Sequence, residues 1–376
     1  MEVPSILFSA VRCGIKAKGP DLGLVFFGDG MDWLAAYTRN RIKAAHILYN
    51  RRVRGPARAL LVVSGCANAF TGKEGVEDLG LLSKRLSELL SIEEQSVLFA
   101  STGVIGKRLP MDKIMGALPS LVRGLSQGRL EAFADSIMTT DTRRKIVVRE
   151  DGALRLLGVA KGAGMIDPRF ATMLSFLFTD CAADRKALKP IFKEALKGSF
   201  ERISVDGDLS PNDTVLFFFR RGDSIPMGLG DVLASVMREL AYLIVRDGEG
   251  RTKVVHVVVR GARRSSQAER IARRIARSPL VKTAFFGSDP NVGRIVAALG
   301  DAEVPFDPQR LEIMIGREIV VRDGKETRFD EEGVRGILQQ EEFEVTIDLN
   351  HGKESFDIYT TDLSYEYVRI NASYRS

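Results

Sequence analysis

The stretch GMIDPRFATMLSFLFTD, residues 164–180, decides how this chain of 376 residues is organised. A glycine and a proline interrupt it, and Ala171-Thr172 then opens a run of Met, Leu and Phe that is apolar enough for a buried strand or helix. A Thr at the entrance to such a run has three interpretations: a cap, a hydrogen-bonded core hydroxyl or a nucleophile. The third interpretation would make this stretch the centre of an active site.

Composition and charge exclude several classes of protein. The chain is 45% hydrophobic and 28% charged, which is typical of a globular protein, and its length predicts two or three structural units. The net charge of +6 suits anionic small molecules, but it is too modest to predict a nucleic-acid partner. No apolar run reaches the roughly 18 residues that span a bilayer, so no membrane partner is predicted. Three scattered cysteines predict neither a disulfide framework nor a metal site, and we expect a cytoplasmic protein.

Short apolar strands and amphipathic helices alternate in the first part of the chain. The runs around residues 58–65 and at 96–103 predict buried strands that each end in a tight turn. Residues 79–90, between them, have the spacing of an amphipathic helix. Residues 145–162 predict a hairpin around Glu150-Asp151-Gly152.

Strands cluster in the last part of the chain, after further helices. Residues 183–200 predict a helix that is kinked at Pro190 or starts near it, and residues 231–245 predict a second helix. Residues 253–261 predict a β-branched strand, and the helix after it has an arginine face. No aromatic residue interleaves with that face, which favours a solvated surface over nucleic-acid binding. Early alternation and late strands favour mixed layers, an α+β protein, over a purely parallel sheet.

Two glycine-rich segments resemble nucleotide-binding loops, but their spacing does not fit. In GCANAFTGKEG (residues 65–75) the gap before Gly72-Lys73 is too long, and Glu74 stands where Ser or Thr would hold magnesium. KGAGM (residues 161–165) is too short for a dinucleotide fingerprint. Neither segment therefore predicts a nucleotide.

The histidines of the chain offer no obvious general base. His46, His256 and His351 are the three present, and the sequence nominates no Ser or Cys partner for any of them. His256 lies within an apolar β-branched run, where a hydrogen-bonded core imidazole is the expected role. A hydroxyl nucleophile in this chain would therefore need another activator.

A Thr nucleophile can obtain that base from its own amine. If the peptide bond before Thr172 is cut, the new α-amino group lies close to Oγ, and its pKa of about 7.7–8.0 suits a base near neutral pH. The cut can follow from the same chemistry: Oγ attacks the preceding carbonyl, an N→O acyl shift gives an ester, and water releases it. Pro168 would stiffen the approach, and Met173 to Phe178 would anchor the new terminus. On these residues alone, an ordinary buried Thr at the start of a strand is the favoured interpretation.

The sequence around Thr172 closely resembles the self-cleavage segment of a known enzyme family. AKGAGMIDPRFATMLSFLFTD is similar to that segment in the ornithine acetyltransferase / glutamate N-acetyltransferase family of arginine biosynthesis, the ArgJ family. Seven more blocks resemble the family in its order: SGCANAFTGKEGVED, ASTGVIGKRLPMDKI, SIMTTDT, ISVDGDLSPNDT, IVRDGEGRTK, SPLVKTAFFGSDPNVGR and DLSYEYVRINASY. Together the blocks extend from about Gly14 to Ser376, effectively the whole chain.

The resemblance implies an acyltransferase that cuts itself and then works by a ping-pong mechanism. Thr172 would be the nucleophile and Ala171-Thr172 the scissile bond, giving an α chain of residues 1–171 and a β chain of residues 172–376. Thr172 would take the acetyl group from N-acetyl-L-ornithine and pass it to L-glutamate, with no metal and no cofactor. The family assembles as two α and two β chains, and the resemblance leaves open whether acetyl-CoA is also a donor.

The resemblance also implies roles for side chains outside the cleavage segment. Thr102 and Gly103 match the oxyanion-hole pair, which an ester mechanism needs because it passes through tetrahedral oxyanions. The positions that match substrate contacts are Thr139 (with Thr140 as the alternative), Lys161, Thr172, Glu249, Asn371 and Ser376. Lys161 could pair with a substrate carboxylate and lower the pKa of the new amine, and Glu249 would suit a substrate ammonium group.

Four positions depart from the family pattern. Ser376 replaces a Thr but keeps its hydroxyl, and Cys66, Phe170 and Val292 stand where Asn, Met and Trp are usual. The segment after Phe27 is also shortened. The nucleophile, the oxyanion pair, the Lys and the Glu all remain, so these departures bear on the shape of the substrate pocket.

The resemblance implies an αββα sandwich of the ArgJ/DmpA type over residues 1–275 and a smaller C-terminal α/β domain over residues 276–376. Two other functions compete with acetyl transfer. An N-terminal-nucleophile aminopeptidase or amidase of the same fold would use the same Thr, although the blocks RDGEG, DPNVGR and VRINASY argue against it. A regulatory or structural protein would keep its chain intact.

Overall fold

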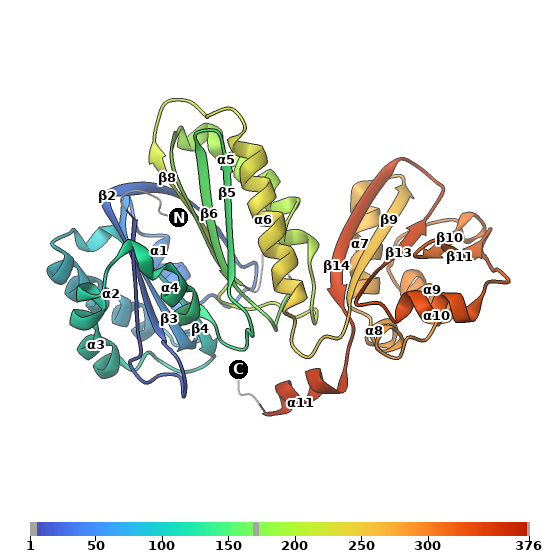
Figure 1. The fold of residues 1–376 in the computed structure, drawn as a ribbon, viewed down its shortest axis with the longest axis horizontal. Helices are drawn as coiled ribbons and strands as arrows, with labels where there is room; N and C mark the ends of the chain where they lie inside the picture. Colours follow the sequence, from blue (N-terminus) through green and yellow to red (C-terminus); the bar gives the residue numbers. More distant parts are fainter. Residues whose placement is uncertain (1–5, 168–172, 374–376) are drawn as a thin grey trace. The chain divides into compact units, whose positions relative to one another are not determined.

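A computed structural model describes residues 6–167 and 173–373 of the chain (Figure 1). These residues form two compact units, which we describe separately. The first unit consists of the residues up to Glu201 together with Asp208–Ile244, and the second consists of Arg202–Gly207 and the residues from Val245 onward. The boundary that the sequence placed at 275/276 falls at the end of a helix inside the second unit, and the proposed cut at 171/172 lies outside the described residues.

Among the described residues, the first unit is built on an eight-stranded sheet in the order β4-β3-β2-β8-β7-β6-β5, with β1 paired to β2. The strands are β1 (Ile6–Val11), β2 (Leu22–Tyr37), β3 (Ala57–Cys66), β4 (Val97–Val104), β5 (Lys145–Asp151), β6 (Leu154–Lys161), β7 (Leu174–Ala183) and β8 (Thr214–Arg221). Strand β2 shifts register between Phe26 and Met31; its first part pairs with β3, and its last part, from Asp32, pairs with β8. The sheet therefore has two halves that share β2.

Helices cover the outer face of each half, as Figure 1 shows. The helices of this unit are α1 (Ala45–Asn50), α2 (Glu74–Leu90), α3 (Met111–Arg123), α4 (Leu130–Ile137), α5 (Arg185–Lys197) and α6 (Leu229–Arg246). Apolar side chains such as Leu82 of α2 and Ile114 of α3 pack against β2, β3 and β4. On the other half, Phe192 of α5 stacks on Phe217 of β8 with ring centroids 6.1 Å apart. This arrangement confirms the α+β class and the αββα layers.

Buried aromatic rings join the inner faces of the two halves. Phe27 of β2 lies 4.6 Å from Phe218 of β8, centroid to centroid, and Phe218 stacks on Phe178 of β7 at 5.4 Å. Phe8 of β1 meets the edge of Phe178 at 5.8 Å. Each such ring removes a large apolar area from water, so this cluster is a major source of stability. The described part of the predicted run, Met173 to Phe178, is confirmed as core.

Other predicted elements of this unit are found with shifted ends. The predicted hairpin is present as β5 and β6, which pair antiparallel from Lys145↔Ala160 to Asp151↔Leu154. The helix predicted over 183–200 starts before Pro190, because the side chain of Asp184 caps its first turn by accepting the N–H of Ala187 at 2.9 Å. A local cap therefore overrides the proline as the start signal.

The second unit has a six-stranded sheet, over the part of the chain that is described, in the order β12-β11-β10-β13-β9-β14. Its elements are β9 (Val254–Ala262), α7 (Ser265–Ala276), α8 (Pro279–Phe286), α9 (Val292–Gly300), β10 (Glu312–Ile315), β11 (Glu318–Arg322), β12 (Lys325–Glu326), α10 (Glu331–Leu338), β13 (Glu342–Asp348), β14 (Glu354–Thr361) and α11 (Tyr365–Ser373). Strand β9 pairs parallel with β13 and antiparallel with β14. On α7, Arg270 and Arg274 form ion pairs with Glu303 and Asp301.

No helix within residues 6–167 and 173–373 combines the length and the apolar composition needed to cross a membrane.

The aromatic cluster gives a stability test. We expect Phe178→Ala to lower the free energy of unfolding by about 3–5 kcal/mol, because it leaves a cavity between the two halves of the sheet. Leu81→Ala is the control, since Leu81 is 56% exposed and its truncation should change stability by no more than about 0.5 kcal/mol. Chemical denaturation at one protein concentration measures both. Equal losses for the two variants would contradict the role of the cluster.

Candidate active site

Strand β4 ends in a backbone approach that admits only glycine. Gly103 has a φ of +126°, and a Cβ on it would lie 2.3 Å from the carbonyl carbon of Gly65 on β3. The pairing of β3 with β4 shifts register at this point, between Gly65 and Cys66. The turn predicted at the end of this strand therefore has a steric cause, and it leaves Thr102 and Gly103 at the strand end.

Lys161 and Thr102, two residues singled out from the sequence, meet in the folded protein. Lys161 is the last residue of β6, and its Nζ donates a hydrogen bond to Oγ1 of Thr102 at 3.1 Å. Both are nearly buried, at 9% and 8% exposure. Lys161 also pairs with Leu174, the first residue of β7, so it lies beside the start of that strand.

Asp141, which the sequence did not single out, organises the surroundings of Lys161. Its Oδ1 accepts hydrogen bonds from Nζ of Lys145 at 2.7 Å and from the N–H of Gly162 at 2.6 Å. Its Oδ2 accepts a hydrogen bond from the N–H of Thr139 at 3.1 Å. Burial alone would raise the pKa of Asp141, but the cations of Lys145 and Lys161 outweigh it and hold the pKa at about 2. Asp141 is therefore a fixed negative charge.

Three lysines, Lys16, Lys145 and Lys161, lie around Asp141. Lys16 donates through Nζ to the carbonyl oxygen of Met138 at 2.8 Å, and it interacts electrostatically with Asp141 and Lys161. Burial lowers the pKa of Lys16. Lys16 also interacts electrostatically with Asp21 and Asp135, so the lysines around Asp141 lie among several carboxylates.

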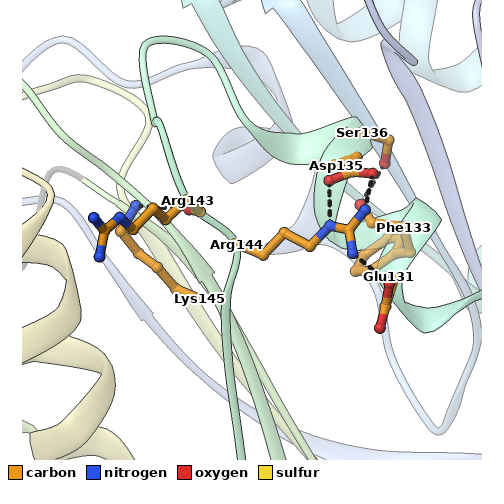
Figure 2. Close-up of polar contacts among 7 residues, drawn as sticks. All are labelled: Glu131, Phe133, Asp135, Ser136, Arg143, Arg144 and Lys145. Atoms are coloured by element: carbon orange, nitrogen blue, oxygen red, sulfur yellow. Dashed lines mark hydrogen bonds and ion pairs between the residues drawn. The ribbon is translucent and has the colours of Figure 1, made fainter.

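Arg144, three residues after Asp141 in the sequence, is tied to helix α4, as Figure 2 shows. Arg144 donates to both carboxylate oxygens of Asp135, from Nε at 2.6 Å and from Nη2 at 2.8 Å, and it also contacts Glu131. A bidentate pair fixes the direction of the guanidinium group as well as its distance. Lys145, the next residue, extends away from this pair in Figure 2, towards Asp141.

The predicted contact residue Thr139 lies two residues before Asp141, with its neighbour Thr140 between them. Both are partly buried, and the backbone N–H of Thr139 is the group that reaches Asp141. The geometry does not choose between the two hydroxyls as the substrate contact.

His46 is a fully buried link between three elements, and the sequence had nominated no partner for it. Its Nδ1 lies 3.0 Å from Oγ of Ser101 on β4, and its Nε2 lies 2.9 Å from Oγ1 of Thr214 on β8. Burial lowers the pKa of His46 to about 3, so the imidazole is neutral. Ser101 directly precedes Thr102, so His46 supports the strand end. No short-range spacing could have shown this, because the partners are 55 and 168 positions away.

Glu249 and Asn371 meet within the second unit. Nδ2 of Asn371, on α11, donates to Oε2 of Glu249 at 2.9 Å. The close approach of α11 to the preceding turn is again set by glycine, since a Cβ on Gly250 would lie 2.2 Å from the nitrogen of Tyr367. The structure therefore brings together two residues that were selected from motifs 122 positions apart.

Several other residues singled out from the sequence remain to be located in the structure. Ala171, Thr172 and Ser376 lie outside the described residues, as does Phe170. Cys66 is buried, and its Sγ lies 3.3 Å from the carbonyl oxygen of Lys107. Val292 is buried at the start of α9. Within the described ranges, no three His, Cys, Asp or Glu side chains gather in a way that could hold a metal ion.

Comparisons with known proteins cover nearly the whole chain. The ArgJ family model matches residues 7–376. The arginine biosynthesis bifunctional protein ArgJ of Geobacter sulfurreducens is 43% identical over 393 residues, with 100% of both chains covered. The glutamate N-acetyltransferase of Methanopyrus kandleri is 42% identical over 378 residues, 96% of this chain and 97% of the relative. A crystal structure of ArgJ from Bacillus halodurans, 34% identical, has a TM-score of 0.51 and covers 54% of this chain and 100% of the solved chain.

His46 gives a pH test of the strand-end support. A histidine whose pKa falls from about 6.5 unfolded to about 3 folded contributes stability above pH 6.5 that is lost as the pH drops. We expect the wild type to lose about 2 kcal/mol more unfolding free energy between pH 7 and pH 5 than His46→Asn does. Denaturation of both proteins at the two pH values measures this difference. Equal losses would show that His46 is not buried in its neutral form.

Proposed function

We propose, from the premise that this chain belongs to the ArgJ family, that it transfers an acetyl group from N-acetyl-L-ornithine to L-glutamate in arginine biosynthesis. The observation that carries this proposal is a match to the family over residues 7–376, with relatives of matching length named for these activities. The meeting of Thr102 with Lys161 and of Glu249 with Asn371 supports it further. The enzyme acts in the cytoplasm as two α and two β chains.

The active form arises by self-cleavage between Ala171 and Thr172. The solved chain from Bacillus halodurans, covered over its full length, corresponds to 54% of this chain, and residues 172–376 make up a similar share, 205 of 376 residues. Met173 and Leu174, directly after the cut, are 3% and 1% exposed, which supports a firmly held new terminus. A rigid terminus is required because the amine and the hydroxyl of Thr172 must keep a reactive geometry.

The reaction proceeds through an acetyl ester on Thr172. The α-amine takes the proton of Oγ while Oγ attacks the acetyl carbonyl of N-acetylornithine, and the resulting ammonium returns the proton to the departing amine of ornithine. The α-amino group of glutamate then attacks the ester and forms a second tetrahedral intermediate. Collapse of this intermediate breaks the bond between the acetyl carbon and Oγ, gives N-acetylglutamate and returns a proton from the attacking nitrogen to Thr172. Both tetrahedral states carry an oxyanion.

Thr102 and Gly103 stabilise that oxyanion. Lys161 supplies the hydrogen of its bond to Thr102, so the hydroxyl of Thr102 keeps its own hydrogen for another acceptor. The N–H of Gly103 is the second donor, held by the backbone approach to Gly65. Donors fixed before the reaction need no reorganisation when the charge develops.

The charges of the substrates are opposite to those of two groups of residues, the lysines around Asp141 and the carboxylate of Glu249. The ammonium groups of Lys16, Lys145 and Lys161 around Asp141 suit the carboxylates of both amino-acid substrates. Glu249, oriented by Asn371, offers a carboxylate to the side-chain ammonium of ornithine. Thr139 and Ser376 complete the proposed contacts. Acetyl-CoA is the proposed second donor.

The nucleophile is tested by the mass of the purified protein. We expect the wild type to consist of two chains that break at 171/172, and Thr172→Ala to remain one chain of 376 residues without transfer activity. Release of acetate and of N-acetylglutamate is then measured with N-acetylornithine, with and without glutamate, and with acetyl-CoA as donor. An unbroken and active wild type would contradict the proposal. Acetate release at one rate, with or without glutamate, would favour the aminopeptidase or amidase alternative.

Thr102 is tested by a pair of substitutions. Thr102→Val keeps the shape but loses the hydroxyl, so we expect kcat, measured per cleaved molecule, to fall about 100- to 1000-fold. Thr102→Ser keeps the donor and should stay within about tenfold of the wild type. A Thr102→Val enzyme as active as Thr102→Ser would show that the hydroxyl does not stabilise the oxyanion.

A further inference from the structure

Glu249, the carboxylate proposed for the substrate ammonium group, lies in a turn between α6 and β9. The turn extends over residues 247–253, and within it the N–H of Arg251 donates to the carbonyl oxygen of Gly248 at 3.1 Å. Oε2 of Glu249 accepts the hydrogen bond from Asn371, whereas Oε1 accepts none from residues 6–167 and 173–373. One oxygen of this carboxylate is therefore available to a cationic ligand, and its direction depends on how the turn is held.

The side chain of Asp362 holds the end of this turn. Asp362 directly follows β14 and is 3% exposed. Its Oδ1 accepts hydrogen bonds from the N–H groups of Thr252 and Lys253 at 2.9 and 3.0 Å, and its Oδ2 accepts one from the hydroxyl of Thr252 at 2.5 Å. Hydrogen bonds to an ionised carboxylate are about twice as strong as neutral ones. The peptide groups at the end of the turn are therefore firmly held.

Ser364, two residues after Asp362, connects the turn to helix α11. Its Oγ donates to the carbonyl oxygen of Gly250 and accepts the N–H of Tyr367, in the first turn of α11, at 3.2 Å. Asn371 lies one helical turn further on, and its Nδ2 donates to the carbonyl oxygen of Tyr367 at 3.1 Å as well as to the carboxylate in the turn. The chain just after β14 therefore places both members of the Glu–Asn pair.

Helix α11 depends on such polar contacts because apolar packing holds little of it. None of its residues, Tyr365–Ser373, is buried, and Tyr365 is 84% exposed. Its other contacts include an edge-on approach of the Tyr365 ring to the ring of Phe286, with centroids 5.5 Å apart, and a hydrogen bond from the hydroxyl of Tyr367 to Asp206 at 3.4 Å. A helix of this length is only marginally stable by itself in water, so its place is set by its anchors.

A buried cation compensates for the charge of Asp362. Lys282, on α8, is 3% exposed, and its Nζ donates to Oγ1 of Thr360 at 3.2 Å and to Oγ1 of Thr361 at 3.1 Å. Burial lowers the pKa of Lys282 to about 8, and the carboxylates of Asp206 and Asp362 oppose this effect because they favour the charged form. Burying a carboxylate is unfavourable unless a charge and hydrogen bonds compensate for it. Lys282 and the end of the turn supply both.

We propose that Asp362, together with Ser364, is a positioning element for Glu249 and thereby determines the preference for a substrate with a side-chain ammonium group. The inference rests on the proposed function, in which Glu249 binds the ammonium group of ornithine. Asp362 fixes the turn that carries Glu249, and Ser364 fixes the helix that carries Asn371. A carboxylate that is already held in one direction binds an ammonium group without a further loss of conformational freedom.

The test compares the two substrates of the proposed ping-pong reaction. Because each substrate reacts in its own step, kcat/KM for N-acetyl-L-ornithine and kcat/KM for L-glutamate report separate half-reactions. Only N-acetylornithine has a side-chain ammonium group. We expect Asp362→Ala to lower kcat/KM for N-acetylornithine about tenfold or more, because Glu249 is no longer aimed. The value for glutamate should change by less than about twofold. Losses of equal size for both substrates would show general damage to the enzyme and would overturn the inference.

A double-mutant cycle tests whether Asp362 acts through Glu249. Glu249→Gln alone should lower kcat/KM for N-acetylornithine, and Asp362→Ala should then add less than about twofold to that loss. Fully additive losses would show that the two residues act independently, and they would overturn the inference. Ser364→Ala should lower the same value about threefold or more, again without affecting glutamate. This variant decides the matter in both measurements if Asp362→Ala does not fold.

Asp301→Ala is the matched control for removal of a carboxylate in the same unit. Asp301 is exposed and paired with Arg274, so its removal should leave both kcat/KM values within about twofold of the wild type. A larger selective loss for N-acetylornithine in this variant would overturn the inference, because the effect would not be specific to Asp362. Intact mass and a thermal melting curve show whether each variant is cut and folded like the wild type.

Binding of L-ornithine, measured by calorimetry, separates the inference from the proposed function. We expect Asp362→Ala to bind ornithine about tenfold or more weakly than the wild type, as Glu249→Gln does. A wild type that binds ornithine but transfers no acetyl group would remove the proposed function, and the binding data would still decide the inference. Asp362→Ala that binds ornithine as tightly as the wild type would overturn the inference alone. A wild type that binds no ornithine would overturn both.

Discussion

A buried hydrogen bond from Lys161 to Thr102 joins the two halves of the eight-stranded sheet, and the geometry of the site depends on it. Burying an ammonium group is unfavourable unless charges and hydrogen bonds compensate for it. Asp141 supplies that charge, and its carboxylate is fixed in turn by Lys145 and by backbone N–H groups. The cation that holds the strand end in place is therefore part of a connected network, which makes the arrangement rigid and specific rather than simply stable.

How much of the fold and of the candidate site could be predicted from the sequence depended on how far apart the interacting residues lie along the chain. The strand that contains Gly103 and the hairpin that ends at Lys161 were predictable, because periodicity and turn residues act locally. Asp141, Lys16 and His46 were not, since each works through partners that only the fold brings near. Their sequence contexts look like a loop, a basic N-terminal segment and the start of a helix. Resemblance supplied Thr102, Lys161, Glu249 and Asn371, and the structure shows that these residues meet in pairs.

Glycine sets the close approaches in both units, for a single physical reason. Gly103 lies against the backbone of Gly65, and Gly250 lies against the backbone of Tyr367, at distances that no Cβ could share. In each case a selected polar residue is the direct neighbour: Thr102 in the first unit and Glu249 in the second. In both places the absence of a side chain lets two backbone segments approach closely beside a polar residue.

The strand order has a consequence for a chain that is cut between β6 and β7. Strands β7 and β8, which follow the cut, lie between β2 and β6, which precede it. To separate, the two chains would have to break the main-chain hydrogen bonds between β2 and β8 and between β6 and β7, and to expose the aromatic cluster. A cut between β6 and β7 would therefore free a terminus while these strand pairings of the first unit stay in place.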